Sequence, residues 1–182
     1  MSAGSHHETE LKFLIQYPDT AFLEAQSGCV KWEIEQIYLT SPEPLSTRRI
    51  RKVIVNSEAH YYRTFKRRVS DMTAEENEGE ITADLYAAYK QEADPACRPI
   101  IKTRYRIPYE GHLLEFDIYP FWQDQAVMEI ELENESVSPA IPPYVSIIRD
   151  VTADPAYKNH ALSRAVPGDN CCRADHPEFS CH

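Results

Sequence analysis

Charged side chains recur at every second residue in several short segments of the chain. The repeated positions are Glu8, Glu10 and Lys12; Arg49 and Arg51; Lys66 and Arg68; Lys102, Arg104 and Arg106; Glu115 and Asp117; and Glu129 and Glu131. Guanidinium and ammonium groups bind phosphate oxygens, and carboxylates bind hard divalent cations such as Mg²⁺. Together, these residue types predict a site that holds a chain of phosphates and a divalent cation.

The two signs of charge are separated along the sequence. The net charge is −10, yet eight of the 19 basic residues fall between Arg48 and Arg68. Between Ile107 and Ile148 there is no lysine or arginine, whereas eight acidic residues occur there. The overall negative charge disfavours nucleic acid as a partner, and we expect none. The uneven distribution favours a fold that brings a basic and an acidic region together.

The elements that must position these charges are mostly β-strands. Strand-like composition covers residues 9–15, 32–40, 48–55, 60–69, 100–107, 112–119 and 126–133. Turn residues stand at Asn56-Ser57 and at Pro108-Tyr109-Glu110-Gly111. Apolar residues at helical spacing predict helices over 18–26 and 73–92, with a last helical turn over 159–165. Seven or eight antiparallel strands with two or three helices predict an α+β fold, most simply a closed or nearly closed β-barrel.

The alternation of charges also predicts which face of each strand is inside. Successive side chains of a strand point to opposite faces, so six of these segments place like charges on one face and mainly apolar groups on the other. For a single strand, a solvated face of an ordinary sheet is the simplest explanation. Six strands that each carry a row of one sign need a different explanation, because like charges on neighbouring strands repel each other. We therefore predict a barrel with a charged interior and an apolar outer face covered by helices.

Length and composition limit the class of protein. The 182 residues predict one domain over residues 1–166, followed by a flexible tail over 167–182. A membrane-spanning run and a secretion signal are not recognisable, and five cysteines do not indicate a disulfide framework, so we expect a cytoplasmic protein without a membrane partner. The tail residues Cys171, Cys172, His176, Cys181 and His182 lack the spacing of a zinc site.

Several segments, taken in order, resemble the CYTH superfamily of triphosphate tunnel metalloenzymes. The first is ETELK at residues 8–12, which is similar to the ExExK signature of that superfamily. The others are IEQIYL (34–39), RRIR (48–51), RTFKRR (63–68), KTRYRI (102–107), LEFDIY (114–119) and MEIELE (128–133), and DVTADPAYKNHALS (150–163) is similar to the closing segment of short bacterial-type members. Each segment is a weak indication alone, but the ordered series is specific.

The resemblance implies an eight-stranded antiparallel tunnel that binds a triphosphate with one or two Mg²⁺ or Mn²⁺ ions. The metal ligands carried over by matching motif are Glu8, Glu10, Asp117, Glu129 and Glu131. The phosphate-binding residues are Lys12, Arg49, Arg51, Lys66, Lys102 and Arg104, with Lys158 as a further candidate. Glu8, Glu10 and Lys12 are the candidate catalytic residues of the opening motif.

The function that the resemblance implies is hydrolysis of inorganic triphosphate, or of a related triphosphate, by in-line attack of a metal-activated water. A class IV type adenylate cyclase and a thiamine triphosphatase are alternatives, because the same cradle suits their substrates. A polyphosphate-binding module without turnover is the alternative outside enzymes. The chain is expected to be a monomer or a homodimer.

Two residues at the ends of the charged rows each allow two interpretations. Arg48 stands where an apolar residue is usual, and it is either an outer-face charge or a sign that the strand register slips by one. Glu133 extends the acidic row, either as a third ligand or, more simply, as a surface group at the strand end.

Overall fold

The computed structural model describes residues 5–43 and 46–167, with side chains from Thr9 onward. The strands are β1 (Ser5–Gln16), β2 (Val30–Leu39), β3 (Ser46–Val55), β4 (Glu58–Arg68), β5 (Thr73–Glu80), β6 (Ile100–Tyr109), β7 (His112–Ile118), β8 (Gln125–Leu132) and β9 (Ile147–Asp150). The helices are α1 (Thr20–Glu24), α2 (Ala83–Tyr89) and α3 (Asn159–Leu162), with the 3₁₀ turns η1 (Lys90–Glu92) and η2 (Pro155–Tyr157).

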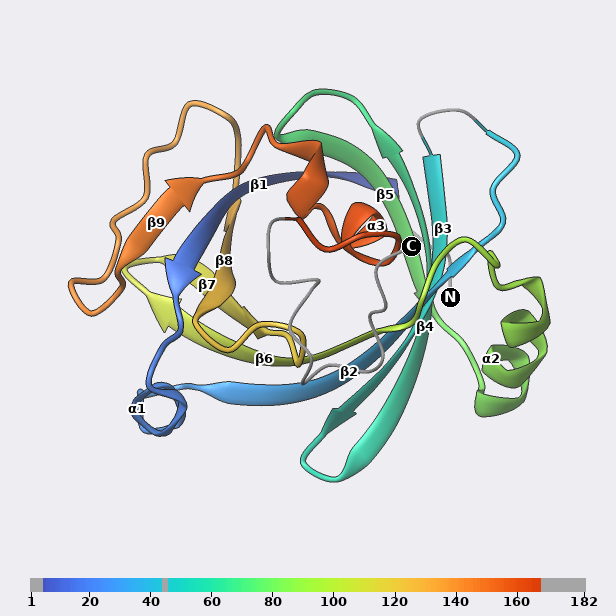
Figure 1. The fold of residues 1–182 in the computed structure, drawn as a ribbon, viewed down its shortest axis with the longest axis horizontal. Helices are drawn as coiled ribbons and strands as arrows, with labels where there is room; N and C mark the ends of the chain where they lie inside the picture. The colour runs from blue at the N-terminus through green and yellow to red at the C-terminus, as the bar shows by residue number, and fades with distance from the viewer. Residues whose placement is uncertain (1–4, 44–45, 168–182) are drawn as a thin grey trace.

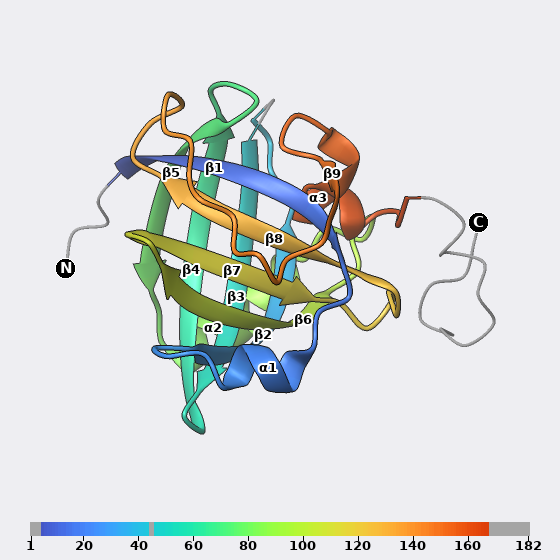
Figure 2. The same ribbon diagram turned by 90° about the vertical axis from the view of Figure 1, so that its left-hand side faces the viewer.

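Eight strands form a closed antiparallel barrel, which confirms the predicted α+β fold (Figure 1). Neighbouring strands follow the order β5-β4-β3-β2-β6-β7-β8-β1, and a pairing between β1 and β5 closes the ring. The first half of β1 pairs with β5, whereas β9 pairs with its second half, from Phe13 to Ile15. The ninth strand is therefore an addition beside the ring, as the side view in Figure 2 shows.

Two tight turns set the register of the hairpins that carry charged rows. Asn56 and Ser57 join β3 to β4 with φ angles of 50° and 67°, and Glu110 and Gly111 join β6 to β7 with φ angles of 45° and 81°. Positive φ at both central residues is typical of the type I′ turn, which matches the twist of the adjoining strands. The predicted turn at Asn56-Ser57 is confirmed, whereas of the predicted turn over 108–111 only Glu110 and Gly111 lie outside the strands, because Pro108 and Tyr109 belong to β6.

The predicted helix over 73–92 is wrong in its first half. Residues Thr73–Glu80 form β5, and only Ala83–Tyr89 form a helix, which begins where the Thr82 hydroxyl accepts a hydrogen bond from the backbone N–H of Leu85. Glycine and asparagine are poor helix formers, and Asn77 and Gly79 interrupt the segment. As a strand, the segment also covers the edges of β1 and β4, which would otherwise present unpaired backbone groups.

The main apolar core lies outside the barrel wall. Side chains from the outer faces of β1, β6, β7 and β8, among them Ile15, Ile107, Phe116 and Met128, pack with Leu23 of α1. A smaller cluster forms under α2, which lies outside β3 and β4 in Figure 1. The apolar side chains of these strands thus lie on the outer face of the barrel, and the charged rows lie on the inner face.

A second apolar cluster fills one end of the barrel interior. Leu14, Tyr38, Ile100 and Val127 pack there with Leu162 of α3. Because Leu14 and Lys12 share a face of β1, the apolar layer lies next to the charged layer along the strand. The closing segment therefore covers one end of the charged space.

Within the described ranges, no helix is long and apolar enough to cross a membrane. The tail residues from position 168 onward, including Cys171, Cys172, His176, Cys181 and His182, lie outside the part of the chain that the structure describes.

Candidate active site

The charged side chains that face the barrel interior form two contiguous arcs. The basic arc comprises Lys66 of β4, Arg49 and Arg51 of β3, and Lys102, Arg104 and Arg106 of β6, with the uncharged Gln36 and Tyr38 of β2 between them. The acidic arc comprises Glu115 and Asp117 of β7, Glu129 and Glu131 of β8, Glu10 of β1, and Glu76 and Glu78 of β5. The arcs face each other across a cavity of about 620 Å³.

Arg104 links the two arcs where β6 meets β7. Its Nε and Nη2 atoms donate to the two carboxylate oxygens of Asp117 at 2.6 and 2.7 Å, and Nη2 also donates to Glu129 at 2.6 Å. A third carboxylate, Glu115, accepts from Nη1. Burial alone would lower the pKa of Arg104, but these carboxylates raise it well above its ordinary value. The guanidinium is thus a fixed positive charge at the centre of the acidic arc.

Lys12 is the basic residue within the acidic arc. Its ammonium lies 2.7 Å from the Glu129 carboxylate and 3.8 Å from that of Glu10, and its side chain is 2% exposed. Burial opposes the charged form, but Glu129 and Glu10 outweigh it and raise the pKa of Lys12. Correspondingly, burial opposes ionisation of Glu129, but Lys12 and Arg104 hold its pKa well below the usual range. Both side chains are charged at neutral pH.

Lys102 differs from Lys12, although both are buried. Its ammonium donates to Asp117 at 2.5 Å and lies 5.7 Å from the centre of the Tyr119 ring. Burial and the neighbouring Arg104 charge lower the pKa of Lys102 to about 8, against the attraction of Asp117 and Glu129. Lys102 can therefore change its charge near neutral pH.

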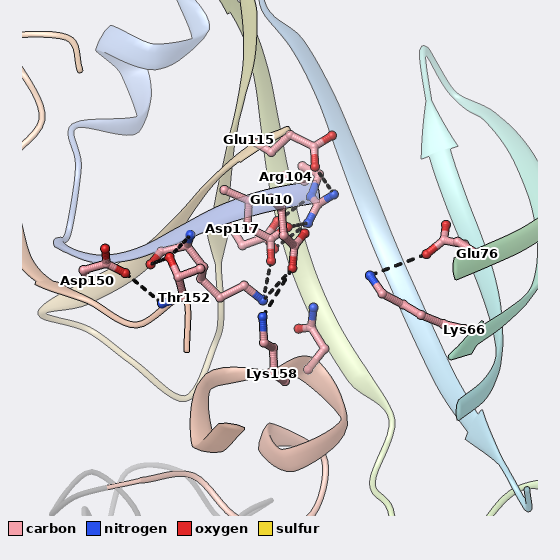
Figure 3. A network of polar contacts seen from close by, with 12 residues as sticks. Glu10, Lys66, Glu76, Arg104, Glu115, Asp117, Asp150, Thr152 and Lys158 are labelled. Carbon is pink, nitrogen blue, oxygen red and sulfur yellow. Dashed lines mark hydrogen bonds and ion pairs between the residues drawn. The ribbon is translucent and has the colours of Figure 1, made fainter. Parts of the chain in front are cut away.

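The structure adds two carboxylates that the sequence prediction missed. Glu78 accepts hydrogen bonds from Arg51 at 2.6 and 2.8 Å and from the Thr64 hydroxyl at 2.6 Å. Glu76 lies 3.6 Å from both Arg49 and Lys66, as Figure 3 shows for Lys66. The predicted helix over 73–92 includes these residues, and a helix does not place alternate glutamates on one face, so the sequence prediction gives β5 no inward face.

The closing segment is attached to β1 at the level of Lys12. The Thr152 hydroxyl accepts from the backbone N–H of Lys12 at 2.9 Å, and the backbone N–H of Val151 donates to the Lys12 carbonyl at 2.9 Å. From this segment Lys158 points toward Glu10, at 3.8 Å (Figure 3). Burial and the charge of Lys12 lower the pKa of Lys158. The cavity thus receives a further cation from outside the barrel wall.

Most of the sequence-predicted site residues lie together around this cavity. The residues that line it are Glu10, Lys12, Arg49, Arg51, Lys66, Lys102, Arg104, Glu129, Glu131 and Lys158. Asp117 is 0% exposed and lies behind Lys102 and Arg104. Glu8 belongs to β1, but its side chain is not among those that the structure describes.

The structure shows on which side of the barrel wall Arg48 lies and where Glu133 lies relative to β8. Arg48 forms a 2.9 Å ion pair with Glu92, which follows the externally packed α2, while Arg49 and Arg51 line the cavity. Arg48 is therefore an outer-face charge, and the strand register does not slip. Glu133 is exposed and follows the last residue of β8, so it is a surface group at the strand end.

The donor set along β1 and β8 suits a hard divalent cation. Glu10 is directly opposite Glu131 in the strand register, and Glu129 is the next inward-facing residue of β8. Carboxylate oxygens at such positions are the ligands that Mg²⁺ and Mn²⁺ prefer. Both oxygens of Asp117 accept hydrogen bonds from Lys102 and Arg104, and those of Glu129 are likewise paired with Lys12 and Arg104. Asp117 is also 0% exposed and is not among the residues that line the cavity, so the residues of the β1–β8 pair fit a metal better than Asp117 does.

Comparison with known proteins identifies the family. A sequence model of the CYTH domain matches residues 6–143. The chain belongs to the CYTH family. A search of curated proteins gave no match.

Solved structures similar to this CYTH protein include NE1496, described as an inorganic triphosphatase. It is 26% identical, with a TM-score of 0.53, over 88% of this chain and 97% of that one. A conserved hypothetical protein from Pyrococcus furiosus is 26% identical, with a TM-score of 0.54, over 71% of this chain and 80% of that one. PH1819 from Pyrococcus horikoshii OT3 is 24% identical, with a TM-score of 0.55, over the same shares, 71% and 80%, and supports the fold alone.

Proposed function

We propose that this CYTH protein hydrolyses a phosphoanhydride bond of inorganic triphosphate with the help of Mg²⁺ or Mn²⁺. The observation that carries the proposal is the pair of opposed arcs around one cavity, because a linear polyanion and a divalent cation need both signs of charge within a few ångströms. The similarity to NE1496, described as an inorganic triphosphatase, supports the same substrate class.

In this proposal the basic arc holds the phosphate chain. Arg49, Arg51 and Lys66 bind one end of it, and Lys102, Arg104 and Lys158 bind the other. Within the described part of the chain, the buried Nε atom of Arg51 has no hydrogen-bond partner, and a phosphate oxygen would supply one. Arginine binds phosphate through two parallel N–H groups, which fixes the chain's orientation as well as its position.

The carboxylates of Glu8, Glu10, Glu129 and Glu131 would hold the cation, whereas we assign Asp117 to positioning Arg104 and Lys102. When bound, the cation would neutralise phosphate oxygens and lower the pKa of the attacking water. Lys12 is charged and fixed by Glu129, so it can stabilise the charge that develops on the leaving diphosphate. Glu10 and Lys12 are accordingly the proposed catalytic residues of the opening motif, together with Glu8.

The shape of the interior supports a small, fully charged substrate. The apolar cluster of Leu14, Tyr38, Ile100 and Val127 fills the space beyond the charged layer, and Leu162 of the closing segment packs onto it. Charged groups therefore surround the remaining cavity on most sides. A linear phosphate chain matches such surroundings along its whole length.

A substrate panel tests the proposal. Purified protein with Mg²⁺ or Mn²⁺ is incubated with inorganic triphosphate, ATP or thiamine triphosphate, and orthophosphate, diphosphate and cyclic AMP are measured. We expect orthophosphate from inorganic triphosphate, and a loss of at least about 100-fold in the double variant Glu129→Gln/Glu131→Gln. Glu133→Gln, beyond the end of the same strand, is the matched control and should retain the activity.

Two results would contradict the proposal. Cyclic AMP and diphosphate from ATP, without orthophosphate from triphosphate, would indicate a cyclase. Binding of triphosphate without turnover, equal in the wild-type protein and the double variant, would indicate a polyphosphate-binding module.

A further inference from the structure

A group of possible metal ligands lies beside the charged cavity and has no part in the proposed hydrolysis. It consists of Asp94, Cys97 and His160, whose donor atoms all lie within 4.8 Å of one another. Among the residues that the structure describes, it is the one group of three such side chains that meets this distance. Unlike the acidic arc, it combines sulfur, nitrogen and oxygen donors.

The backbone of residues 94–97 presents two of the donors on one side. One carboxylate oxygen of Asp94 accepts from the backbone N–H of Ala96 at 2.9 Å, and the backbone N–H of Cys97 donates to the Asp94 carbonyl at 3.0 Å. This turn leaves the second oxygen, Oδ2, 3.6 Å from the Cys97 sulfur. The backbone hydrogen bonds of this turn therefore hold the Asp94 carboxylate close to the Cys97 sulfur.

The third donor comes from the closing segment. His160 belongs to α3, and its ring lies 4.8 Å from the ring of Tyr38 in the barrel wall. The backbone N–H of Arg98 donates to the carbonyl of Ser163 at 2.8 Å, so the 94–98 loop is already attached to the end of α3. The three side chains thus meet where the closing segment contacts the barrel.

We propose that Asp94, Cys97 and His160 bind Zn²⁺, or a similar transition-metal ion, at this contact. Zinc takes thiolate, imidazole and carboxylate ligands in tetrahedral geometry, which separates the donor atoms by about 3.4–3.8 Å. The Asp94–Cys97 separation of 3.6 Å already lies in this range. The other two separations are at most 4.8 Å, so that binding would shorten each by up to about 1 Å, and water would complete the coordination.

One cation competes with the metal at this place. Arg164 donates to Asp94 Oδ2 at 3.0 Å, and its side chain is 48% exposed. Ion pairs at this exposure contribute little to stability, so the guanidinium can move into solvent when the metal binds. The Cys97 thiol loses its proton on binding, which makes the affinity depend on pH.

The consequence is a metal clamp on the closing segment, distinct from the carboxylate site. The ion would join the loop that precedes β6 to α3, whose preceding residue Lys158 extends toward Glu10. Binding to the folded state alone stabilises it, in proportion to the logarithm of the metal concentration. The inference does not depend on the identity of the substrate.

Cobalt substitution tests the proposal on the full-length chain. Because any free thiol can give a thiolate-to-cobalt band, the experiment removes the three tail cysteines by using the background variant Cys171→Ser/Cys172→Ser/Cys181→Ser. Adding Co²⁺ should produce a near-ultraviolet thiolate-to-cobalt absorption with a stoichiometry of about one ion per chain. The further change Cys97→Ser should abolish this band, whereas Cys29→Ser, at the other half-buried cysteine of the described chain, should leave it unchanged.

Thermal unfolding with Zn²⁺ provides the second measurement. We expect Zn²⁺ to raise the unfolding midpoint of the background variant, and Asp94→Asn and His160→Gln each to reduce that rise and to weaken Co²⁺ binding by about 10-fold or more. These two variants keep the test valid even if Cys97→Ser fails to fold. Absence of the thiolate band in the background variant, or its persistence in folded Cys97→Ser, would overturn the proposal.

Discussion

Asp117 holds two cations that have been removed from water. It is 0% exposed, and its oxygens accept from Lys102 at 2.5 Å and from Arg104 at 2.6 and 2.7 Å. Although burial opposes its ionisation, Arg104 and Lys102 lower the pKa of Asp117. Its negative charge is therefore part of the folded structure as well as of the site.

Replacing Asp117 with alanine should destabilise the protein strongly. The change removes the carboxylate that the buried Lys102 ammonium contacts and leaves Arg104 with two of its three carboxylate partners, which costs about 3–5 kcal/mol in the free energy of unfolding. Urea unfolding followed by circular dichroism measures it. The control is Glu24→Gln, which removes an ion pair with Lys31 whose side chains are 49% and 46% exposed, and should cost less than about 1 kcal/mol. Equal effects of the two changes would contradict the assignment of Asp117.

The pKa of Lys102 predicts a pH dependence of substrate capture. With a pKa of about 8, the side chain carries its charge below that pH and loses it above, so it attracts phosphate less as the pH rises. We expect the ratio of kcat/KM between the wild-type protein and Lys102→Gln to fall as the pH rises through about 8. The ratio cancels the titration of the substrate itself. A constant ratio from about pH 6 to about pH 10 would show that Lys102 does not act through its charge.

At the scale of elements, β5 places negative charge against the basic arc. Glu76 lies 3.6 Å from both Arg49 and Lys66 and therefore competes with phosphate for them. The change Glu76→Gln should tighten the binding of triphosphate by about 10-fold, because a repulsive charge is removed from a poorly solvated site. Isothermal titration in EDTA measures binding without turnover.

The same strand offers the control for that prediction. Glu75 is adjacent to Glu76 but forms a 2.6 Å ion pair with Arg67, and the side chains of Arg67 and Glu75 are 58% and 36% exposed. Glu75→Gln should leave the dissociation constant unchanged. If both variants bind triphosphate like the wild-type protein, β5 does not face the phosphate site.

The elements that carry an alternating pattern of charge could be predicted from the sequence, and β5 could not. In β3, Arg49 and Arg51 bracket an apolar residue, so the inward face was evident. In β5, the run from Thr73 to Glu80 contains one alanine and no large apolar side chain to mark either face. Its conformation is decided by pairing with β4, the preceding strand, and with β1, which is distant in the sequence. Local propensity does not contain that information.

At the scale of the whole molecule, the sequence predicted most of the charges that face inward, Glu76 and Glu78 excepted, but not which of them meet. The separation of basic and acidic segments anticipated two opposed regions, and the consecutive pairs β3–β4 and β7–β8 are indeed neighbours in the barrel. In contrast, β6 joins the basic arc through β2, and β5 joins the acidic arc through β1. The network around Arg104, however, depends on the register of three strands, β6, β7 and β8. Likewise, the sequence did not predict β9 or the group of Asp94, Cys97 and His160. Such contacts result from closure of the barrel.

Crystallography with bound ligands tests the central claim, which is that the basic arc binds phosphate and the acidic arc binds a divalent cation within the same cavity. The wild-type protein is crystallised with Mn²⁺ and a triphosphate analogue whose bridging oxygens are replaced by nitrogen. We predict an anomalous Mn²⁺ peak at the carboxylates of Glu10, Glu129 and Glu131, and phosphate groups within hydrogen-bond distance of Arg49 and Arg51 in the same cavity. Metal and analogue bound on the outer surface, with the interior ion pairs unchanged, would contradict it.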